Sequence, residues 1–325
     1  MGINMIFLKV IILVIGIVCS NYALSMTQTE MEDFFQEFDD LTDQEAVSDI
    51  LNKADYDERV IPKVTTPWEK KAWYQYHPIF LDSKRRLELA IEFYEEYQSV
   101  LEDAEKKYGV EKEIILAILG IESFYGNYMG KYNVLDTLYT LAYHYPKRSR
   151  FFKQELYHFI QLSLDIKWDV DDIKGSYAGA MGWSQFISSS YRHFAHSYKE
   201  GEAPNLIDSP EDAIFSVANY FKKHNWNIND KVAQEIDLPY DSIKDFLWNG
   251  KRPTLQENDL AHIDQLDDYI DEDDRVNFIR LKESEHETKN YILYHNFYVI
   301  SRYNHSPLYA MVVFELSQKI KNSIE

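Results

Sequence analysis

Residues 114–126 read Ile-Ile-Leu-Ala-Ile-Leu-Gly-Ile-Glu-Ser-Phe-Tyr-Gly, an apolar run that contains a single carboxyl group, that of Glu122. If the run is helical, Ile115, Ile118 and Leu119 lie seven, four and three residues before Glu122 and share its face. Apolar surroundings disfavour an ionised carboxylate, so we expect a raised pKa, which suits a general acid near neutral pH. The alternative is a structural carboxyl that pairs with a buried arginine or caps a neighbouring backbone.

The composition is that of a folded, acidic and aromatic-rich protein. The chain has 325 residues, enough for one large domain or two ordinary ones, and its 45% hydrophobic content allows a sizeable core. Its 25 tyrosines, 18 phenylalanines and 6 tryptophans suit a carbohydrate groove, although an aromatic core would use the same residues. The net charge of −20 repels phosphate backbones, so we expect no nucleic-acid partner.

The N-terminus has the pattern of an export signal. Lys9 precedes an apolar stretch at 10–18, and Ala23-Leu24-Ser25 places small residues where a signal peptidase reads them. We therefore predict a signal peptide over residues 1–25 and a periplasmic protein. An uncleaved or lipidated form, the latter on Cys19, would make the protein membrane-associated. Cleavage after Ser25 would remove Cys19, the single cysteine, and leave no disulfide chemistry.

The hydrophobic periodicity predicts a mainly α protein of the α+β class. A 3.6-residue period favours helices over 83–108 and 307–323, and residues 134–165 are also expected to be helical, with an interruption at Pro146. Another helix is expected to start at Pro210, with Ser209 as its cap.

The domain organisation follows from the shifts in composition. We divide the chain into an acidic N-terminal segment and connector at 26–68 and one catalytic domain at 69–325. Residues 226–295 of that domain are expected to form a polar insertion and small β lobe, in which 276–281 and 290–294 pair as strands.

The sequence lacks the motifs of several common cofactor-binding and metal-binding sites. The chain has no phosphate loop, no dinucleotide fingerprint and no zinc spacing, so we expect no cofactor and no metal. His193 and His196 are predicted to be surface residues because no third ligand is evident. Ser176 and Ser184 lie near glycines, but neither occupies a nucleophile elbow.

Three ordered blocks resemble the membrane-bound lytic murein transglycosylase B family. The first is Gly-Ile-Glu-Ser-Phe-Tyr-Gly at 120–126, followed by Met-Gly-Lys at 129–131 and Leu-Asp-Thr-Leu at 135–138. The second is Gly-Ser-Tyr-Ala-Gly-Ala-Met-Gly-Trp-Ser-Gln-Phe at 175–186. The third comprises Asn-Phe-Tyr at 296–298, Arg-Tyr-Asn-His-Ser at 302–306 and Tyr-Ala-Met at 309–311. The similarity extends over about residues 70–320. It implies a lysozyme-like helical core with a small mixed lobe.

The resemblance also implies an activity and its residues. The activity is cleavage of the β-1,4 bond between N-acetylmuramic acid and N-acetylglucosamine in peptidoglycan without water, which leaves 1,6-anhydromuramoyl ends. Glu122 resembles the single catalytic acid and base of the family. Residues expected to bind the glycan strand or its peptides are Ser176, Gln185, Tyr303, Asn304, Tyr309, Tyr76 and the basic pair Lys147 and Arg148.

One carboxyl suffices for this reaction because the substrate supplies the attacking group. Most glycosidases use two carboxyls, but the three blocks offer only Glu122 and Asp136, and the helical setting of Asp136 predicts a structural hydrogen bond. Glu122 would protonate the glycosidic oxygen and then, as carboxylate, accept the proton of the muramic acid 6-hydroxyl as that hydroxyl closes onto C1.

The chain departs from the family pattern at two places. The family often carries a calcium loop, but the loop at 197–208 has Ser197, Lys199 and Gly201 at the early ligand positions, so we predict no tight calcium site. Ser188 replaces a usual proline, which is predicted to loosen that loop.

Three other functions remain open at the level of sequence. The chain could be a hydrolytic muramidase of the same bond, or a non-catalytic peptidoglycan-binding or scaffold protein. It could also be an acidic protein whose Glu122 is structural, although that alternative leaves the second and third blocks unexplained. We expect the glycan strands of peptidoglycan to be the main binding partner and the protein to be a monomer. A periplasmic location is also compatible with protein partners in the cell envelope.

Overall fold

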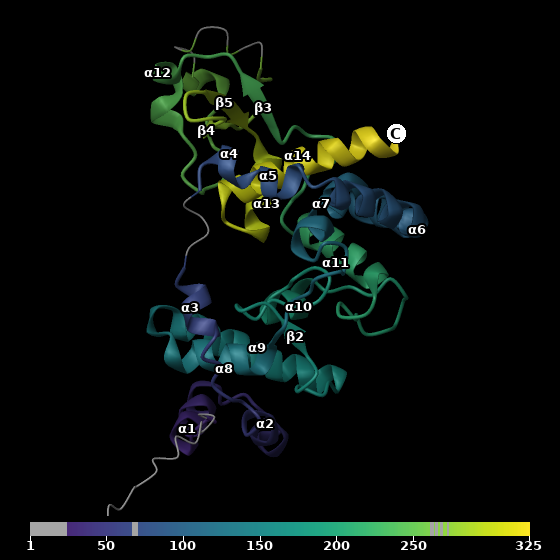
Figure 1. Cartoon of the computed structure of the whole chain (residues 1–325), viewed down its shortest axis with the longest axis vertical. Coiled ribbons are helices and arrows are strands. Elements are labelled where there is room, and N and C mark those ends of the chain that lie inside the picture. Colours follow the sequence, from purple (N-terminus) through teal and green to yellow (C-terminus); the bar gives the residue numbers. More distant parts are fainter. Residues whose placement is uncertain (1–24, 67–70, 261–262, 264–265, 267–268, 272) are drawn as a thin grey trace, which may run out of the picture.

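Figure 1 shows the computed structural model, which describes residues 25–325 except 67–70, 261–262, 264–265, 267–268 and 272. The predicted export signal therefore lies outside the described residues apart from Ser25. Helices form most of the molecule, with a small three-stranded sheet at one end and the N-terminal helices α1 and α2 at the other. None of the helices in the described part is both long enough and apolar enough to cross a membrane.

Helix α7 runs through the centre of the helical core. Its contacts are with α6, α11 and α14, and every residue from Ile114 to Gly120 is buried. The long helix and the tail helix predicted from periodicity are confirmed, and Ser209 caps α11 as expected, since its side chain accepts the Asp212 N–H. The helices of this part of the core are α4 (Trp73–Tyr76), α5 (Pro78–Leu81), α6 (Lys84–Tyr108), α7 (Lys112–Glu122), α11 (Pro210–Lys223), α13 (His295–Tyr303) and α14 (Pro307–Ile324).

A second group of helices packs around the pair α8 and α9, which are antiparallel neighbours in Figure 1. The predicted interruption at Pro146 is confirmed, since the helical region divides there into α8 and α9. Asp136 of α8 accepts the Asp55 N–H at 2.9 Å, which confirms its structural role and ties the N-terminal segment to this pair. The helices of this group are α1 (Gln28–Glu37), α2 (Gln44–Leu51), α3 (Val60–Val64), α8 (Val134–His144), α9 (Ser149–Ile166) and α10 (Ser188–Phe194).

Two short strands, β1 (Tyr132–Asn133) and β2 (Lys174–Gly175), pair antiparallel and join the loop after α7 to the glycine block. The remaining strands are β3 (Ala233–Ile236), β4 (Asn277–Lys282) and β5 (Thr288–Leu293), which form the small lobe together with the short helix α12 (Tyr240–Ile243).

The small lobe is an antiparallel sheet of order β3-β5-β4 with its own apolar cluster, which includes Ile243, Phe278 and Ile292. The predicted strand pair is confirmed as β4 and β5. Strand β3 was not predicted, because its four residues enclose the polar pair Gln234-Glu235 and give no period-2 alternation.

Candidate active site

Glu122 is the last residue of α7, and its carboxyl lies where three elements meet. The side chain is half-buried, so a substrate can reach it, yet protein atoms surround the carboxyl closely. Burial raises the pKa of Glu122 to about 7, while the hydrogen bond from Tyr309 opposes the rise. Near neutral pH the group is therefore present both as acid and as carboxylate, which suits a residue that donates and then accepts a proton.

Tyr309 contacts Glu122 directly, across 187 positions of sequence. Its hydroxyl donates to Glu122 Oε1 at a short distance of 2.5 Å. Tyr309 lies in the first turn of α14, where the Ser306 side chain accepts its N–H. Burial and then the charge of Glu122 raise the pKa of Tyr309 well above its ordinary value, so the phenol remains a donor.

Two further tyrosines lie in this region: Tyr303 near the Glu122 carboxyl and Tyr76 near Tyr309. Tyr303, in α13, donates its hydroxyl to the Ser184 carbonyl at 2.6 Å, and burial followed by the charge of Glu122 raises its pKa. Tyr76, in α4, is near enough for its charge to raise the pKa of Tyr309. The structure thus brings two predicted tyrosines to Glu122, Tyr303 from α13 and Tyr309 from α14, and places Tyr76 of α4 near Tyr309.

The backbone turns sharply after Glu122. Phe124 and Tyr125 both have left-handed φ values, 53° and 54°, and Gly126 follows at 75°. Consecutive left-handed residues other than glycine cost of order 1–3 kcal/mol each and are found chiefly at functional sites. A Cβ on Gly126 would lie 2.4 Å from the Trp183 ring, so the first block and the glycine block are in close contact here.

The glycine block presents two predicted sugar-binding side chains. Ser176 Oγ accepts the N–H groups of Ala178 and Ala180, which leaves the hydroxyl hydrogen for a ligand. Gln185 Nε2 donates to the carbonyls of Met129 and Gly182, so its amide oxygen remains as an acceptor for a sugar hydroxyl.

A cavity of about 250 Å³ joins this block to α13 and has a cationic lining. Arg302 and His305 line this cavity, but they were not among the binding residues predicted from sequence. Their position within the third block was the sequence feature that could have identified them. No acidic side chain lines it among the residues described. Its lining consists of Arg148, Phe151, Gln185, Phe186, Ile187, Ser190, Tyr220, Arg302, Tyr303 and His305.

Five predicted binding residues do not line this cavity, namely Ser176, Tyr76, Lys147, Asn304 and Tyr309. Lys147 faces a separate, open hollow of about 470 Å³ that it shares with Arg148 and Arg150. Asn304 is exposed, and its Oδ1 accepts the Ser306 N–H at 3.1 Å, so the structure shows Asn304 supporting the corner between α13 and α14.

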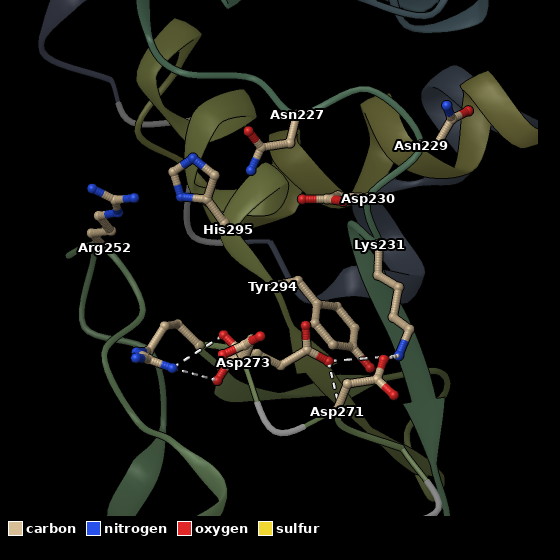
Figure 2. Close-up of a pocket in the computed structure, with 11 residues that line it drawn as sticks. Asn227, Asn229, Asp230, Lys231, Arg252, Asp271, Asp273, Tyr294 and His295 are labelled. Atoms are coloured by element: carbon tan, nitrogen blue, oxygen red, sulfur yellow. Dashed lines mark hydrogen bonds and ion pairs between the residues drawn. The ribbon is translucent and has the colours of Figure 1, made fainter.

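A further cavity of about 510 Å³ lies at the junction of the small lobe and the helical core, as Figure 2 shows. Acidic and basic groups line it together, and some pair with one another, as Lys231 does with Asp271 at 3.1 Å and Asp274 at 3.6 Å. Neither Glu122 nor any predicted substrate residue lines it. The groups that line this cavity are therefore separate from the residues predicted to bind and cleave the substrate.

The loop at 197–208 does not fit a calcium ion. The Asp212 carboxylate accepts the N–H groups of Tyr198 at 2.8 Å and Asn205 at 2.7 Å, so protein donors already bind both of its oxygens. Lys199 lines the adjacent cavity of about 240 Å³ together with Glu202, Glu211 and Asp212, and its charge would oppose a cation among these carboxyls. Hard cations need several free oxygens in such a loop.

We therefore predict that calcium leaves this protein unchanged. Addition of 1 mM calcium (on the order of the weakest protein calcium sites) should not raise the melting temperature, and a chelator should not lower it. Differential scanning calorimetry measures both. An upward shift on addition of calcium would mean that Asp212 exchanges its backbone partners for the ion.

Ser188 is buried at the start of α10, and its neighbour Ser189 is held firmly. Glu155 of α9 accepts the Ser189 N–H at 2.9 Å and the Ser189 hydroxyl at 2.7 Å. The Glu155 carboxylate accepts donors that are free at this helix start. An interaction from α9 therefore fixes Ser189, next to Ser188, the position at which the family usually has proline.

Comparison with known proteins gives consistent matches. A family model described as the Transglycosylase SLT domain matches residues 27–318. The membrane-bound lytic murein transglycosylase B of Escherichia coli strain K12 is 37% identical over 255 residues, which cover 77% of this chain and 67% of that relative. The soluble lytic transglycosylase SltB1 of Pseudomonas aeruginosa superposes with a TM-score of 0.82 at 32% identity, covering 90% of this chain and 99% of that one. A lytic transglycosylase of Escherichia coli solved in complex with calcium has a TM-score of 0.78 at 32% identity, covering 90% and 93%.

Proposed function

Because the chain belongs to the Transglycosylase SLT domain family, we propose that Glu122 is the residue with which it cleaves peptidoglycan. The protein is a lytic transglycosylase with a lysozyme-like fold, and it cleaves the N-acetylmuramic acid to N-acetylglucosamine bond without water. The observation that carries the assignment of Glu122 is its half-buried carboxyl with a pKa of about 7 and a short hydrogen bond from Tyr309.

The proposed reaction has two proton transfers at one carboxyl. Protonated Glu122 donates its proton to the glycosidic oxygen, the bond from C1 of the muramoyl residue to that oxygen breaks, and N-acetylglucosamine leaves with a free 4-hydroxyl. The carboxylate then accepts the proton of the muramoyl 6-hydroxyl while its oxygen bonds to C1 and closes the 1,6-anhydro ring. Glu122 ends protonated, as it began.

The predicted binding residues have chemistry that suits a peptide-bearing glycan. Gln185 and Ser176 offer an acceptor and a donor to sugar hydroxyls, and Tyr76 and Tyr303 offer ring faces. Arg148, and Lys147 on the open hollow beside it, match the carboxylates of stem peptides. Asn304 is proposed to act at the rim of the groove.

Product mass tests the function and separates it from hydrolysis. The purified protein is incubated with peptidoglycan, and the muropeptides are analysed by mass spectrometry. The proposed reaction yields anhydro-muropeptides, whereas a muramidase yields products heavier by one water. Absence of any soluble product would support a non-catalytic wall-binding protein.

The proposed location is the periplasm. The signal pattern at residues 1–25 supports export, and the substrate is found outside the cytoplasmic membrane. N-terminal sequencing of the protein from its host would identify cleavage after Ser25, retention of the signal, or modification of Cys19.

The Tyr309→Phe variant should shift the pH dependence of activity upward. The Tyr309 hydroxyl stabilises the Glu122 carboxylate, so its loss raises the pKa of Glu122 above its present value of about 7. The alkaline limb of kcat/KM should move to higher pH, and kcat should fall roughly tenfold or more because the carboxyl is less well oriented. A Tyr294→Phe variant is the control, since that hydroxyl donates to Tyr269 in the small lobe. An unmoved alkaline limb in Tyr309→Phe would refute the role of this hydrogen bond.

A further inference from the structure

Arg86 is a buried cation without a carboxylate partner. It lies in the first turn of α6, is 9% exposed, and has no acidic group within ion-pair distance among the described residues. Its neighbour Arg85 pairs with Glu92 in the ordinary way at 2.9 Å. A buried charge is costly unless hydrogen bonds satisfy it, so the partners that Arg86 does have indicate its role.

Those partners are backbone carbonyls at the ends of two helices. Nη1 of Arg86 donates to Ile79 at 3.0 Å and to Phe80 at 2.9 Å, both in α5. Nε donates to the Gly120 carbonyl of α7 at 3.1 Å. The last carbonyls of a helix lack intrahelical partners and carry partial negative charge, so a guanidinium is a fitting donor.

The Gly120 carbonyl lies in the same helical turn as Glu122. In a continuing helix it would accept the Phe124 N–H, but the left-handed turn at Phe124 ends the helix before that bond forms. The Leu119 carbonyl instead accepts the N–H groups of Ser123 and Tyr125. Arg86 thus donates a hydrogen bond to the Gly120 carbonyl, which the sharp turn leaves without a backbone partner.

Aromatic contacts add to this attachment. The Arg86 guanidinium lies over the ring of Phe124 at 5.0 Å and over that of Phe80 at 5.2 Å, distances typical of cation–π contacts. On the same helical turn, the Tyr125 hydroxyl packs so closely on Gly120 that a Cβ there would lie 2.5 Å from it. The strained residues after Glu122 therefore contact Arg86 and the helix it holds.

We propose that Arg86 is a positioning residue for catalysis. By binding the Gly120 carbonyl and the Phe124 ring, it fixes the last turn of α7 and holds the Glu122 carboxyl against the Tyr309 hydroxyl. This role rests on the proposed function of Glu122. Arg86 acts through the backbone, because its donors bind carbonyls and none of them binds the carboxyl.

The direct test is the titration of Glu122 in an Arg86→Lys variant. Lysine keeps the charge but loses the planar fork that reaches three carbonyls. Carbon-13 NMR of labelled glutamate carboxyls, with Glu122 assigned by its absence in Glu122→Gln, measures the carboxyl pKa without substrate. The other groups that face Glu122, Tyr309 of α14 and Tyr303 of α13, stay protonated throughout the range. Two effects oppose each other: a weaker Tyr309 hydrogen bond raises the pKa of Glu122, and entry of water lowers it. Burial is the larger of the two causes in the wild type, so we expect the pKa to fall from about 7 by at least about half a unit toward its ordinary value as the freed turn lets water in.

Kinetics supplies the second measurement. Per folded molecule, kcat of Arg86→Lys should fall roughly tenfold to a hundredfold, while KM changes by less than about threefold, since misplacing a reacting group affects chemistry more than binding. The matched control is Lys319→Met, because Lys319 also donates to a carbonyl at the end of α5, that of Leu81, and no hydrogen bond or ion pair among the described residues joins its side chain to α7. This control should leave both the titration and kcat unchanged.

The outcomes separate cleanly. If Arg86→Lys is less stable but keeps the wild-type titration and the wild-type kcat per folded molecule, Arg86 is merely structural and the proposal is wrong. An equal shift in Lys319→Met also overturns it. If Arg86→Lys fails to fold, the same titration of Glu122 is carried out on Phe124→Leu. This variant removes one of the two rings that contact the Arg86 guanidinium, so we expect a smaller pKa shift in the same direction. A wild-type protein that releases no anhydro-muropeptides would refute the proposed function, whereas the titration would still test the positioning.

Discussion

Glu122→Gln should reduce release of anhydro-muropeptides by at least about a thousandfold, because general acid–base catalysis by one side chain is worth on the order of 10² to 10⁴ at each of two steps. Glutamine has nearly the shape of glutamate and keeps an oxygen that can accept the Tyr309 hydroxyl. It can neither donate a proton to the glycosidic oxygen nor accept one from the 6-hydroxyl. Chromatography of the released muropeptides measures the loss.

The same substitution should stabilise the folded protein at high pH, which shows that the loss of activity is not a loss of fold. The pKa of Glu122 is raised to about 7 in the folded state from an ordinary value of 4.5. Between these values the folded state binds more protons than the unfolded state, so the wild-type free energy of unfolding declines as pH rises, and it levels off above pH 7. Glutamine has no such dependence. The difference in unfolding free energy between the variant and the wild type should therefore widen by about 3 kcal/mol from pH 4 to pH 8.

Two results would contradict this account. A Glu122→Gln protein that still releases anhydro-muropeptides would assign the proton transfers to another group. A stability difference that does not change between pH 4 and pH 8 would mean that the carboxyl titrates like an exposed one. Urea denaturation at the two pH values provides the second measurement.

Gly130→Ala should unfold the loop that carries the glycine block, at a cost of about 3–5 kcal/mol. Its φ of +98° is one that residues with a side chain rarely adopt, and an added Cβ would lie 2.0 Å from the Gly175 carbonyl oxygen. Backbone must move to admit it, and with it Ser176 and the Met129 carbonyl that Gln185 binds. Thermal denaturation should show a melting temperature lower by roughly 10 °C, together with a severe loss of activity.

Gly201→Ala is the matched control. Its φ of +81° is similar, but a Cβ there has nothing within 4 Å. It should cost only the conformational strain, about 1 kcal/mol, and leave activity intact. Equal destabilisation by the two substitutions would show that backbone strain, and not the contact with Gly175, dominates at Gly130.

Local patterns in the sequence were sufficient for much of the fold. The helix that contains Glu122 is an unbroken apolar run, the C-terminal tail has a 3.6-residue apolar period, and Ser209-Pro210 has the chemistry of a helix start. These features depend on neighbours within a few residues, so the sequence reveals them directly. Strand β3 lacks any such local signal, because its pairing with β5 depends on residues about sixty positions away.

The proposed catalytic acid, Glu122, was identifiable from sequence, since an isolated carboxyl in an apolar helical run predicts burial and a raised pKa, and the structure shows both. The structure decided everything that depends on long-range contact: the Tyr309 hydroxyl that binds Glu122 from 187 positions away, and the three carbonyls that Arg86 joins. A helical pattern in the sequence shows which face of the helix is buried, but it does not show which side chains from other elements will contact that face. The sequence by itself therefore determined which residue is the candidate proton carrier, and only the tertiary structure decided what holds that residue in place, because such contacts arise from the packing of α6, α13 and α14 around the end of α7.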